Sequence, residues 1–302
     1  MSTPRYAHLD ESVRGEVELP PAQRIALLQT ERFVMHRRVQ RLVDEIEFLL
    51  ESPPKTRASG IVVAAPQGSG KTMLANLIER RHGAQPAAVA GGRRTHAAVA
   101  VSMTNARDAR TLYNRLLDRL GAPASASARY SDRERQLVRI LGEFQTRLLV
   151  IDEIQDILTS TPRQQRLALD AVKFLMNEAS LPVLALGIDT AAAAIRVDRH
   201  LAARFEHRSL PVWTFDDDLG DFLEAFEPFI ALKQPSHLNS PTLMKTLVEL
   251  SNGVLLKIVQ LLVYAAIYAV LEGKERIDVG LVQRAAEYPP VDAIKLKKEE
   301  ET

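Results

Sequence analysis

The sequence predicts an α/β fold with a mainly parallel sheet flanked by helices, followed by a small all-helical domain. Up to residue 213, short β-branched runs alternate with amphipathic stretches, a pattern typical of a parallel sheet covered on both faces. After residue 213 the strand patterns end and only helical stretches follow. With 302 residues, the chain is long enough to form two cores of modest size.

The N-terminal part, residues 1–52, is predicted to be a polar arm followed by an amphipathic helix. Residues 1–20 are polar, and we expect them to be poorly ordered. From Met35 to Leu50, apolar side chains recur at steps of three and four, which is the spacing of one helix face. Two consecutive prolines then end this helix where the α/β domain, residues 53–214, begins.

The α/β domain is expected to consist of short apolar strands joined by helices, because strands buried on both faces are apolar throughout. The strands are predicted at residues 61–65, 97–103, 147–153, 181–187 and 210–213. Helices are predicted at residues 73–83, 107–121, 132–145 and 161–179, the last with Pro162 in its first turn.

Residues 215–290 are predicted to form a helical lid domain. The most apolar stretch of this lid, residues 253–273, nearly reaches the length of a membrane span, but Lys257 and Gln260 interrupt it. We therefore expect a buried helix there and no membrane partner. The charged tail, residues 291–302, is expected to be disordered.

Composition limits the possible functions. The chain has 39 Lys and Arg against 38 Asp and Glu, so binding to nucleic acid would depend on local patches of charge. The absence of cysteine excludes disulfides, thiolate metal sites and cysteine nucleophiles, and is consistent with a reducing cytosol. The N-terminus lacks the apolar core of a signal peptide, so we expect a cytoplasmic protein.

The segment AAPQGSGKTM, residues 64–73, has the pattern of a phosphate-binding loop between a strand and a helix. In such loops glycines let the backbone approach an anion, the lysine binds the β- and γ-phosphates, and a hydroxyl binds Mg²⁺. The expected nucleotide contacts are Ala65, Pro66, Gln67, Gly68, Ser69, Gly70, Lys71, Thr72 and Met73. Ala65 replaces the usual glycine, and we expect it to be tolerated if the backbone there is strand-like.

A second motif, LLVIDEIQDI, supports the interpretation of this loop, which by itself could be a fortuitous turn. The motif places Asp152 and Glu153 at the end of a predicted strand. Asp152 and Thr72 are expected to hold Mg²⁺, and Glu153 is expected to orient the water that attacks the γ-phosphate. The sequence therefore predicts an enzyme that hydrolyses ATP to ADP and phosphate, with Lys71 and Glu153 as catalytic residues.

The Asp-Glu pair, the arginine-bearing segment after it and the helical lid are similar to those of AAA+ ATPases. The similarity implies that Arg204 is a catalytic arginine finger for a neighbouring subunit, with Arg199 and Arg208 as alternatives. It also implies a nucleotide sensor in the lid. Lys257 is the candidate, although a lysine extending from an apolar helix into water is an equally good interpretation.

The similarity implies two further roles. The polar residue that normally ends the fourth strand would be Asp189 or Thr190, because Ile188 occupies the expected position. Asn105, after the second predicted strand, is a candidate for restraining Glu153 until a ligand arrives.

The order of the motifs resembles the TniB family of transposition ATPases over about residues 20–290. The segments that carry the resemblance are ESPPKTRASGIVVAAPQGSGKTML, LLVIDEIQDIL, LPVLALGIDTAAAAIRVDRHLAARFE and LPVWTFDDDLGDFLEAFE. Family members typically have Gly-Thr where this chain has Gly187-Ile188. The resemblance implies an ATP-dependent regulator that binds double-stranded DNA with little sequence preference, oligomerises as a ring or filament, and recruits or activates a DDE-type transposase.

Positive charge on two predicted helices is the only direct indication of DNA binding. The arginines are Arg107, Arg110, Arg115 and Arg119 on the first helix and Arg129, Arg133, Arg135 and Arg139 on the second. Such rows can follow phosphates, but a solvated helix face paired with nearby acids is the alternative. A helicase-loader or replication-initiator ATPase, and an ATP-switched protein adaptor with little hydrolysis, remain alternative functions.

Overall fold

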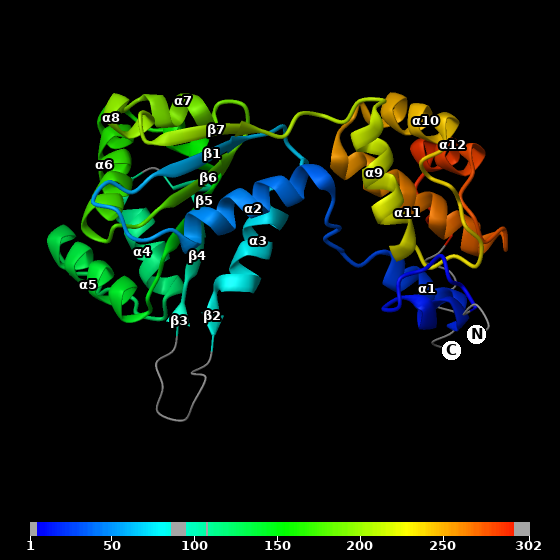
Figure 1. Ribbon diagram of the computed structural model, residues 1–302, viewed down its shortest axis with the longest axis horizontal. Helices are drawn as coiled ribbons and strands as arrows, with labels where there is room; N and C mark the ends of the chain where they lie inside the picture. Colours follow the sequence, from blue (N-terminus) through cyan, green and yellow to red (C-terminus); the bar gives the residue numbers. More distant parts are fainter. Residues whose placement is uncertain (1–4, 86–94, 107, 293–302) are drawn as a thin grey trace. The chain divides into compact units, whose positions relative to one another are not determined.

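The computed structural model describes residues 5–85, 95–106 and 108–292. By its internal contacts the chain divides into two units, whose elements are labelled in Figure 1. We call Arg41–Pro211 the sheet unit, and Met1–Gln40 together with Val212–Thr302 the helical unit. The helical unit thus includes the N-terminal segment, whereas the sequence predicts a lid made of C-terminal residues alone. Residues 293–302 of the predicted disordered tail lie outside the described residues.

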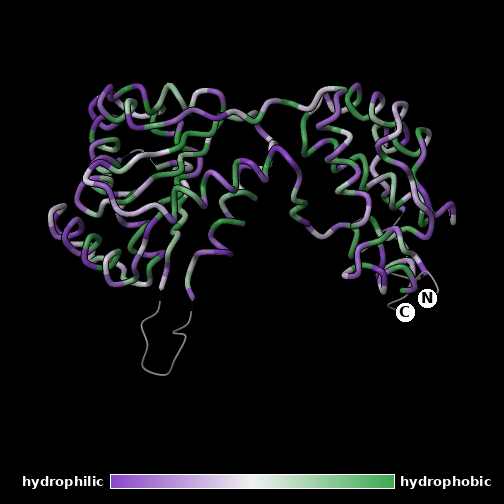
Figure 2. Tube along the Cα trace, viewed as in Figure 1, coloured by the Kyte–Doolittle hydropathy of each residue, from purple (hydrophilic) through white to green (hydrophobic). Residues whose placement is uncertain are grey.

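The sheet unit is built on a parallel sheet with the strand order β4-β5-β6-β1-β7. The strands are β1 (Gly60–Ala64), β4 (Ala98–Ser102), β5 (Leu148–Asp152), β6 (Val183–Gly187) and β7 (Phe205–Ser209). All residues of β5 and β6 are buried, and hydrophobic positions recur along the strands (Figure 2). A separate antiparallel pair consists of β2 (Ala84–Gln85) and β3 (Thr95–His96). The predicted α/β fold class is confirmed.

Helices connect and cover the strands of the sheet unit. They are α2 (Arg37–Glu51, which begins in the helical unit), α3 (Lys71–His82), α4 (Ala109–Arg119), α5 (Tyr130–Glu143), η2 (Ile154–Thr159), α6 (Pro162–Glu178), α7 (Ala191–Arg196) and α8 (Arg199–Ala202). The side chain of Thr161 accepts a hydrogen bond from the Gln164 N–H, and Pro162 occupies the first position of α6, so α6 begins where the sequence predicts.

The last strand is not the predicted one. Residues 210–213 were expected to form it, but β7 lies immediately before them and pairs with β1, Phe205 opposite Gly60. The reason is the burial of Trp213, which is 5% exposed in the core of the helical unit. Its N–H donates to the Gly253 carbonyl at 2.8 Å, so Trp213 packs with the helical unit. Leu210 stays with the sheet unit, and its N–H donates to the Ala64 carbonyl at 3.1 Å, directly after β7.

The helical unit surrounds one long apolar helix. Its elements are η1 (Arg14–Glu18), α1 (Pro21–Leu28), α9 (Asp217–Phe226), η3 (Glu227–Phe229), α10 (Pro241–Ser251), α11 (Leu255–Leu271) and α12 (Val279–Glu287). As expected, α11 is mostly buried and packs against α1, α10 and α12. Within the described parts of the chain, no single helix is long and apolar enough to cross a membrane. Only α10 and α11 taken together pass that test, and they are bent by 119°.

The expectation of a poorly ordered N-terminal arm is wrong for residues 5–20. Leu9, Val13 and Val17 are buried and form a small cluster with Ala231. In the sequence these three apolar residues are separated by polar ones, so the segment as a whole has a polar composition. The N-terminal segment is therefore part of the packed helical unit.

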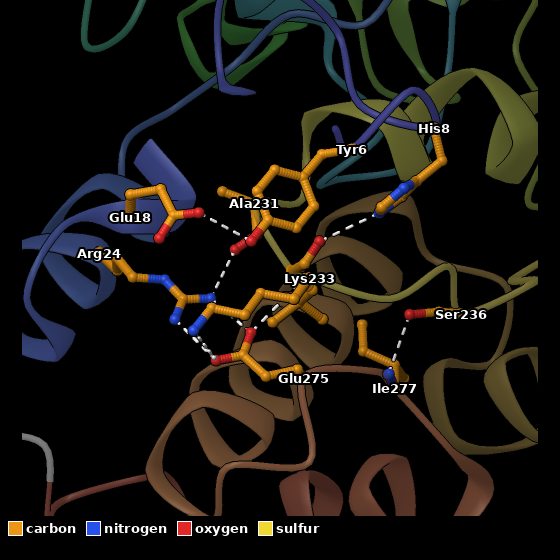
Figure 3. A network of polar contacts seen from close by, with 10 residues as sticks. Tyr6, His8, Glu18, Arg24, Ala231, Lys233, Ser236, Glu275 and Ile277 are labelled. Carbon is orange, nitrogen blue, oxygen red and sulfur yellow. Dashed lines mark hydrogen bonds and ion pairs between the residues drawn. The ribbon is translucent and has the colours of Figure 1, made fainter. Parts of the chain in front are cut away.

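A buried ion pair also binds the N-terminal segment to the rest of this unit (Figure 3). Both terminal nitrogens of Arg24 donate to Glu275, at 2.8 and 2.7 Å, and one also donates to the Ala231 carbonyl. Burial opposes ionisation of Glu275, but the hydrogen bonds and charge of Arg24 outweigh it, so the pKa of this carboxyl is lowered. Nearby, His8 Nε2 lies 3.1 Å from the Leu232 carbonyl oxygen.

Replacing Arg24 by methionine should destabilise the helical unit by about 3 kcal/mol, because the buried Glu275 carboxylate loses both guanidinium hydrogen bonds and is left with the weaker contacts to Lys233. Denaturant unfolding followed by circular dichroism measures the loss. Lys245→Ala is the matched control, since it removes an exposed ion pair with Glu249 and should cost less than about 1 kcal/mol. Equal losses of unfolding free energy in the two variants would show that the Arg24–Glu275 pair stabilises the unit no more than an exposed ion pair does.

His36 is a buried titratable residue of the same unit. Its ring centroid lies 5.1 Å from that of Trp213 and 5.4 Å from that of Phe222. Burial, assisted by the charge of Arg38 and opposed by that of Asp218, lowers the pKa of His36 to about 4. The folded protein therefore holds this histidine neutral under conditions in which the unfolded chain begins to protonate it.

The stability of the protein should consequently fall as pH decreases from about 6.5 to about 4, by at most ~3 kcal/mol from this residue. The sign follows because the unfolded chain binds the proton more tightly over this range. Urea unfolding near neutral pH and near pH 5 measures the effect. His36→Phe should lose less stability between the two conditions, and an unchanged pH dependence would show that His36 does not cause it.

Candidate nucleotide site

The predicted phosphate loop joins β1 to α3. Gly68 and Gly70 have φ angles of +77° and +89°, in the left-handed region where glycine is favoured. The helix α3 begins at Lys71, so the unpaired N–H groups of its first turn face the loop. The structure thus has the strand, loop and helix that the sequence predicts, in an order suited to an anion.

Ala65 fits the loop because its position does not require glycine. Its φ is outside the left-handed region, and its side chain is fully buried. The Ala65 N–H donates to the Gly187 carbonyl at 3.0 Å, which joins the start of the loop to the end of β6. The departure from the usual pattern therefore leaves the backbone of the loop unstrained at this residue.

The Lys71 ammonium is enclosed by the same loop. It donates to the carbonyl oxygens of Ala65 at 2.8 Å and Pro66 at 2.9 Å, and the residue is 5% exposed. Burial lowers the pKa of Lys71, while the carboxylates of Glu153 and Asp152 oppose this shift. The site thus combines a fixed cation with nearby carboxylates.

Asp152 lies at the same edge of the sheet as the loop, because β5 pairs in parallel with β6 and β6 with β1. The Thr72 hydroxyl donates to Asp152 Oδ2 at 2.7 Å. Hydroxyl and carboxylate oxygens are the ligands that Mg²⁺ prefers. The donor set formed by Thr72 and Asp152 therefore fits the metal ion that the sequence predicts.

Glu153 directly follows this strand, with a φ of +56° that is unusual for a residue with a side chain. Its carboxylate accepts a hydrogen bond from Gln155 Nε2. Asn105, which the sequence suggests as its restraint, instead donates its backbone N–H to Asp156 at 3.0 Å. Sequence reasoning misses Gln155 because its other partner, the Ile188 N–H, lies 33 residues further along the chain.

The two sensor assignments stay predictions. Asp189 and Thr190 follow β6 and are exposed, and Ile188 contributes its backbone N–H to the site through Gln155. Lys257 is exposed on α11, in the other unit, and its contact with a nucleotide stays a prediction.

Arg204 directly precedes β7, on the edge of the sheet opposite to the loop. Its guanidinium donates to Asn177 at 2.7 Å. Of its two alternatives, Arg199 is exposed on α8, and Arg208 pairs with both Glu45 and Glu206 at 2.6 Å. Within one chain, Arg204 and the phosphate loop therefore lie at opposite ends of the paired strands β7 and β1.

The arginines of α4 are engaged in contacts within the sheet unit. Arg110 donates to the Ala126 carbonyl at 2.8 Å, Arg115 donates to the carbonyls of Ser102 and Thr104, and Arg119 pairs with Glu79. Arg107 lies outside the described residues. A phosphate would have to compete with these contacts, and DNA binding by this helix stays a prediction.

The second predicted helix corresponds to α5, which begins directly after Arg129. Its other three arginines also make contacts within the sheet unit. Arg133 is buried and donates to Asn114 at 2.8 Å, Arg135 pairs with Asp132, and Arg139 pairs with Glu143 at 2.9 Å. The contacts of Arg135 and Arg139 correspond to the alternative of a helix face paired with its own acids, whereas Arg133 is a buried residue of the sheet unit.

Comparison with known proteins agrees with this geometry. The family model described as "Bacterial TniB protein" matches residues 24–215. No curated protein matches the sequence of the chain.

Solved structures share the fold at low sequence identity. The Aeropyrum pernix ORC2 protein with ADPNP and ADP matches with a TM-score of 0.60 and 16% identity, covering 87% of this chain and 71% of that chain. The Aeropyrum pernix ORC1 protein in complex with DNA matches with a TM-score of 0.56 and 16% identity, covering 86% and 68%. A single-residue variant of Thermotoga maritima RuvB matches with a TM-score of 0.51 and 13% identity, covering 86% and 72%. The fold is that of AAA+ ATPases.

The loop geometry predicts that two small substitutions affect the affinity for ATP differently. Ala65→Gly should keep the affinity for an ATP analogue within about twofold, because position 65 needs no special backbone conformation. Gly70→Ala should weaken it about tenfold, since a Cβ is strained by 1–2 kcal/mol, roughly, at a φ of +89°. Titration with a fluorescent ATP analogue measures both affinities. Equal weakening by both changes would contradict this account of the loop.

Proposed function

The chain belongs to the TniB family, and we propose that it is an ATP-dependent regulator of DNA transposition. In this proposal it binds ATP and Mg²⁺, oligomerises on double-stranded DNA with little sequence preference, and recruits or activates a DDE-type transposase at the target. The observation that carries the proposal is the Thr72–Asp152 hydrogen bond beside the phosphate loop, in a chain of this family.

Hydrolysis is assigned to residues at the carboxyl edge of the sheet. The loop N–H groups and Lys71 would bind the β- and γ-phosphates, and Thr72 and Asp152 would hold the metal ion. When bound, Mg²⁺ supplies positive charge that neutralises the phosphate oxygens. Glu153 would accept a hydrogen bond from the attacking water and orient it toward the γ-phosphate.

Oligomerisation is supported by the place of Arg204. It directly precedes a five-residue strand whose end lies beside the loop, and such a strand is about 16 Å long. Arg204 is therefore too distant to serve its own nucleotide. A role in catalysis would require the nucleotide of a neighbouring subunit, and ATP would then bind at the contact between copies of the chain.

DNA is proposed as a partner because of the family and because the ORC1 protein of similar fold was solved in complex with DNA. With a net charge of +1, the chain would bind phosphates through local groups of arginines. Arg107, Arg110, Arg115 and Arg119 are the candidates. Binding through the backbone phosphates carries little sequence preference.

The other candidate functions share the same core. A helicase-loader or replication-initiator ATPase would respond to a replicative helicase and not to a transposase. An ATP-switched adaptor would bind its partner equally well in the wild type and in Glu153→Gln, with negligible turnover in both. Measuring turnover with each candidate partner separates the three.

Glu153→Gln should lower kcat at least about 100-fold while leaving the affinity for ATP unchanged, because it removes only the group that orients water. The variant should remain as oligomers on DNA in the presence of ATP, as seen by electron microscopy.

Arg204→Ala should lower the turnover of the oligomer but not that of the monomer. If Arg208→Ala lowered the turnover of the oligomer and Arg204→Ala did not, the arginine finger would be Arg208. Monomers alone on duplex DNA with a slowly hydrolysed ATP analogue would contradict the proposal.

A further inference from the structure

The side chain of Gln155 lies between the ends of β5 and β6 in the sheet unit. It follows β5 in η2 and is 8% exposed. Its amide nitrogen donates to Glu153 Oε2 and lies 3.4 Å from Asp156 Oδ1. Its amide oxygen accepts from the Ile188 N–H at 3.1 Å, just beyond β6.

These partners fix the orientation of the amide. A backbone N–H can only donate, so it must face the amide oxygen, and the carboxylates accept and must face the amide nitrogen. Turning the amide over would lose the bond to Ile188 and bring two acceptors together at Glu153. Gln155 therefore has one favourable arrangement, and this arrangement holds the Glu153 carboxylate.

Gly187 makes this approach possible. A Cβ at Gly187 would lie 2.2 Å from Gln155 Oε1 and 2.9 Å from the Cβ of Ala191. The Gly187 carbonyl also accepts from the Ala65 N–H at the start of the phosphate loop. One residue at the end of β6 thus contacts both the loop and the glutamine that holds Glu153.

We propose that Gln155 is the positioning residue for Glu153 and couples its carboxylate to the end of β6, where Ile188 replaces a polar side chain. This inference rests on the proposed ATPase function. The hydrogen bond from Gln155 occupies one carboxylate oxygen of Glu153 and leaves the other to accept a hydrogen bond from the attacking water. The amide of Gln155 is engaged by Glu153, Asp156 and the Ile188 N–H, so we expect it to act through Glu153.

Gln155→Leu should lower kcat about 10- to 100-fold in the full-length protein, because a displaced carboxylate orients the water poorly. The Kd of a fluorescent ATP analogue should change less than about twofold, which also shows that the site is folded. Gln165→Leu is the matched control. This glutamine donates to the carbonyls of Leu158 and Ser160 at the end of η2, and its removal should leave kcat nearly unchanged.

A second variant gives a readout that a structural role would not change. Gln155→Glu keeps the shape of the side chain but places a carboxylate against Glu153 and Asp156. Its kcat relative to wild type should rise as pH falls from about 8 to about 6, because a proton bound by the new carboxyl at position 155 restores the donor to Glu153. A constant ratio across this range would overturn the proposal even if Gln155→Leu fails to fold.

Gly187→Ala tests the approach of the amide independently. It should reduce kcat like Gln155→Leu, and the double variant Gly187→Ala/Gln155→Leu should lose little beyond either single change, because both act on the same contact. If Gln155→Leu had the same kcat as the wild type while Glu153→Gln lost activity as expected, the inference would be overturned and the proposed function would stand. If the wild type showed no more turnover than Glu153→Gln, with or without DNA, both the inference and the proposed function would be overturned.

Discussion

The parallel pairing of β5, β6 and β1 is the constraint on which the candidate site depends. Because the three strands run in the same direction, their carboxyl ends meet at one edge of the sheet. This brings the phosphate loop after β1, the acids Asp152 and Glu153 at the end of β5, and Ile188 after β6 to the same edge. There the Thr72 hydroxyl donates to Asp152, and Gln155 joins the Glu153 carboxylate to the Ile188 N–H. A slip of one residue in the register would reverse the direction of the side chains and separate Thr72 from Asp152.

The same arrangement assigns different tasks to the two edges of the sheet. The carboxyl edge carries the groups suited to phosphate, metal and water, while Arg204 and its contact with Asn177 lie at the amino edge. Within one chain these groups cannot meet. In the proposed function, an ATP-dependent oligomer is therefore a requirement of catalysis, because the second edge must come from a neighbouring subunit.

Much of the fold was predictable because its signals are local. The loop glycines, Lys71 and the acids of VIDE are recognised within short segments, and the apolar runs of the strands reflect burial on both faces. Gln155 was not predictable, because its role depends on contact with a residue 33 positions away. The last strand was misplaced because the burial of Trp213 in the helical unit cannot be distinguished, from the sequence, from burial in a sheet.

We expect one edge of the sheet to bind ATP and Mg²⁺ through Lys71, Thr72 and Asp152. An experimental structure of the protein with Mg²⁺ and a slowly hydrolysed ATP analogue tests this directly. The γ-phosphate should lie beside the Lys71 ammonium, the metal ion beside the Thr72 hydroxyl, and the Glu153 carboxylate should face the γ-phosphate. A nucleotide bound elsewhere, or a metal ion held without Thr72 and Asp152, would contradict this expectation.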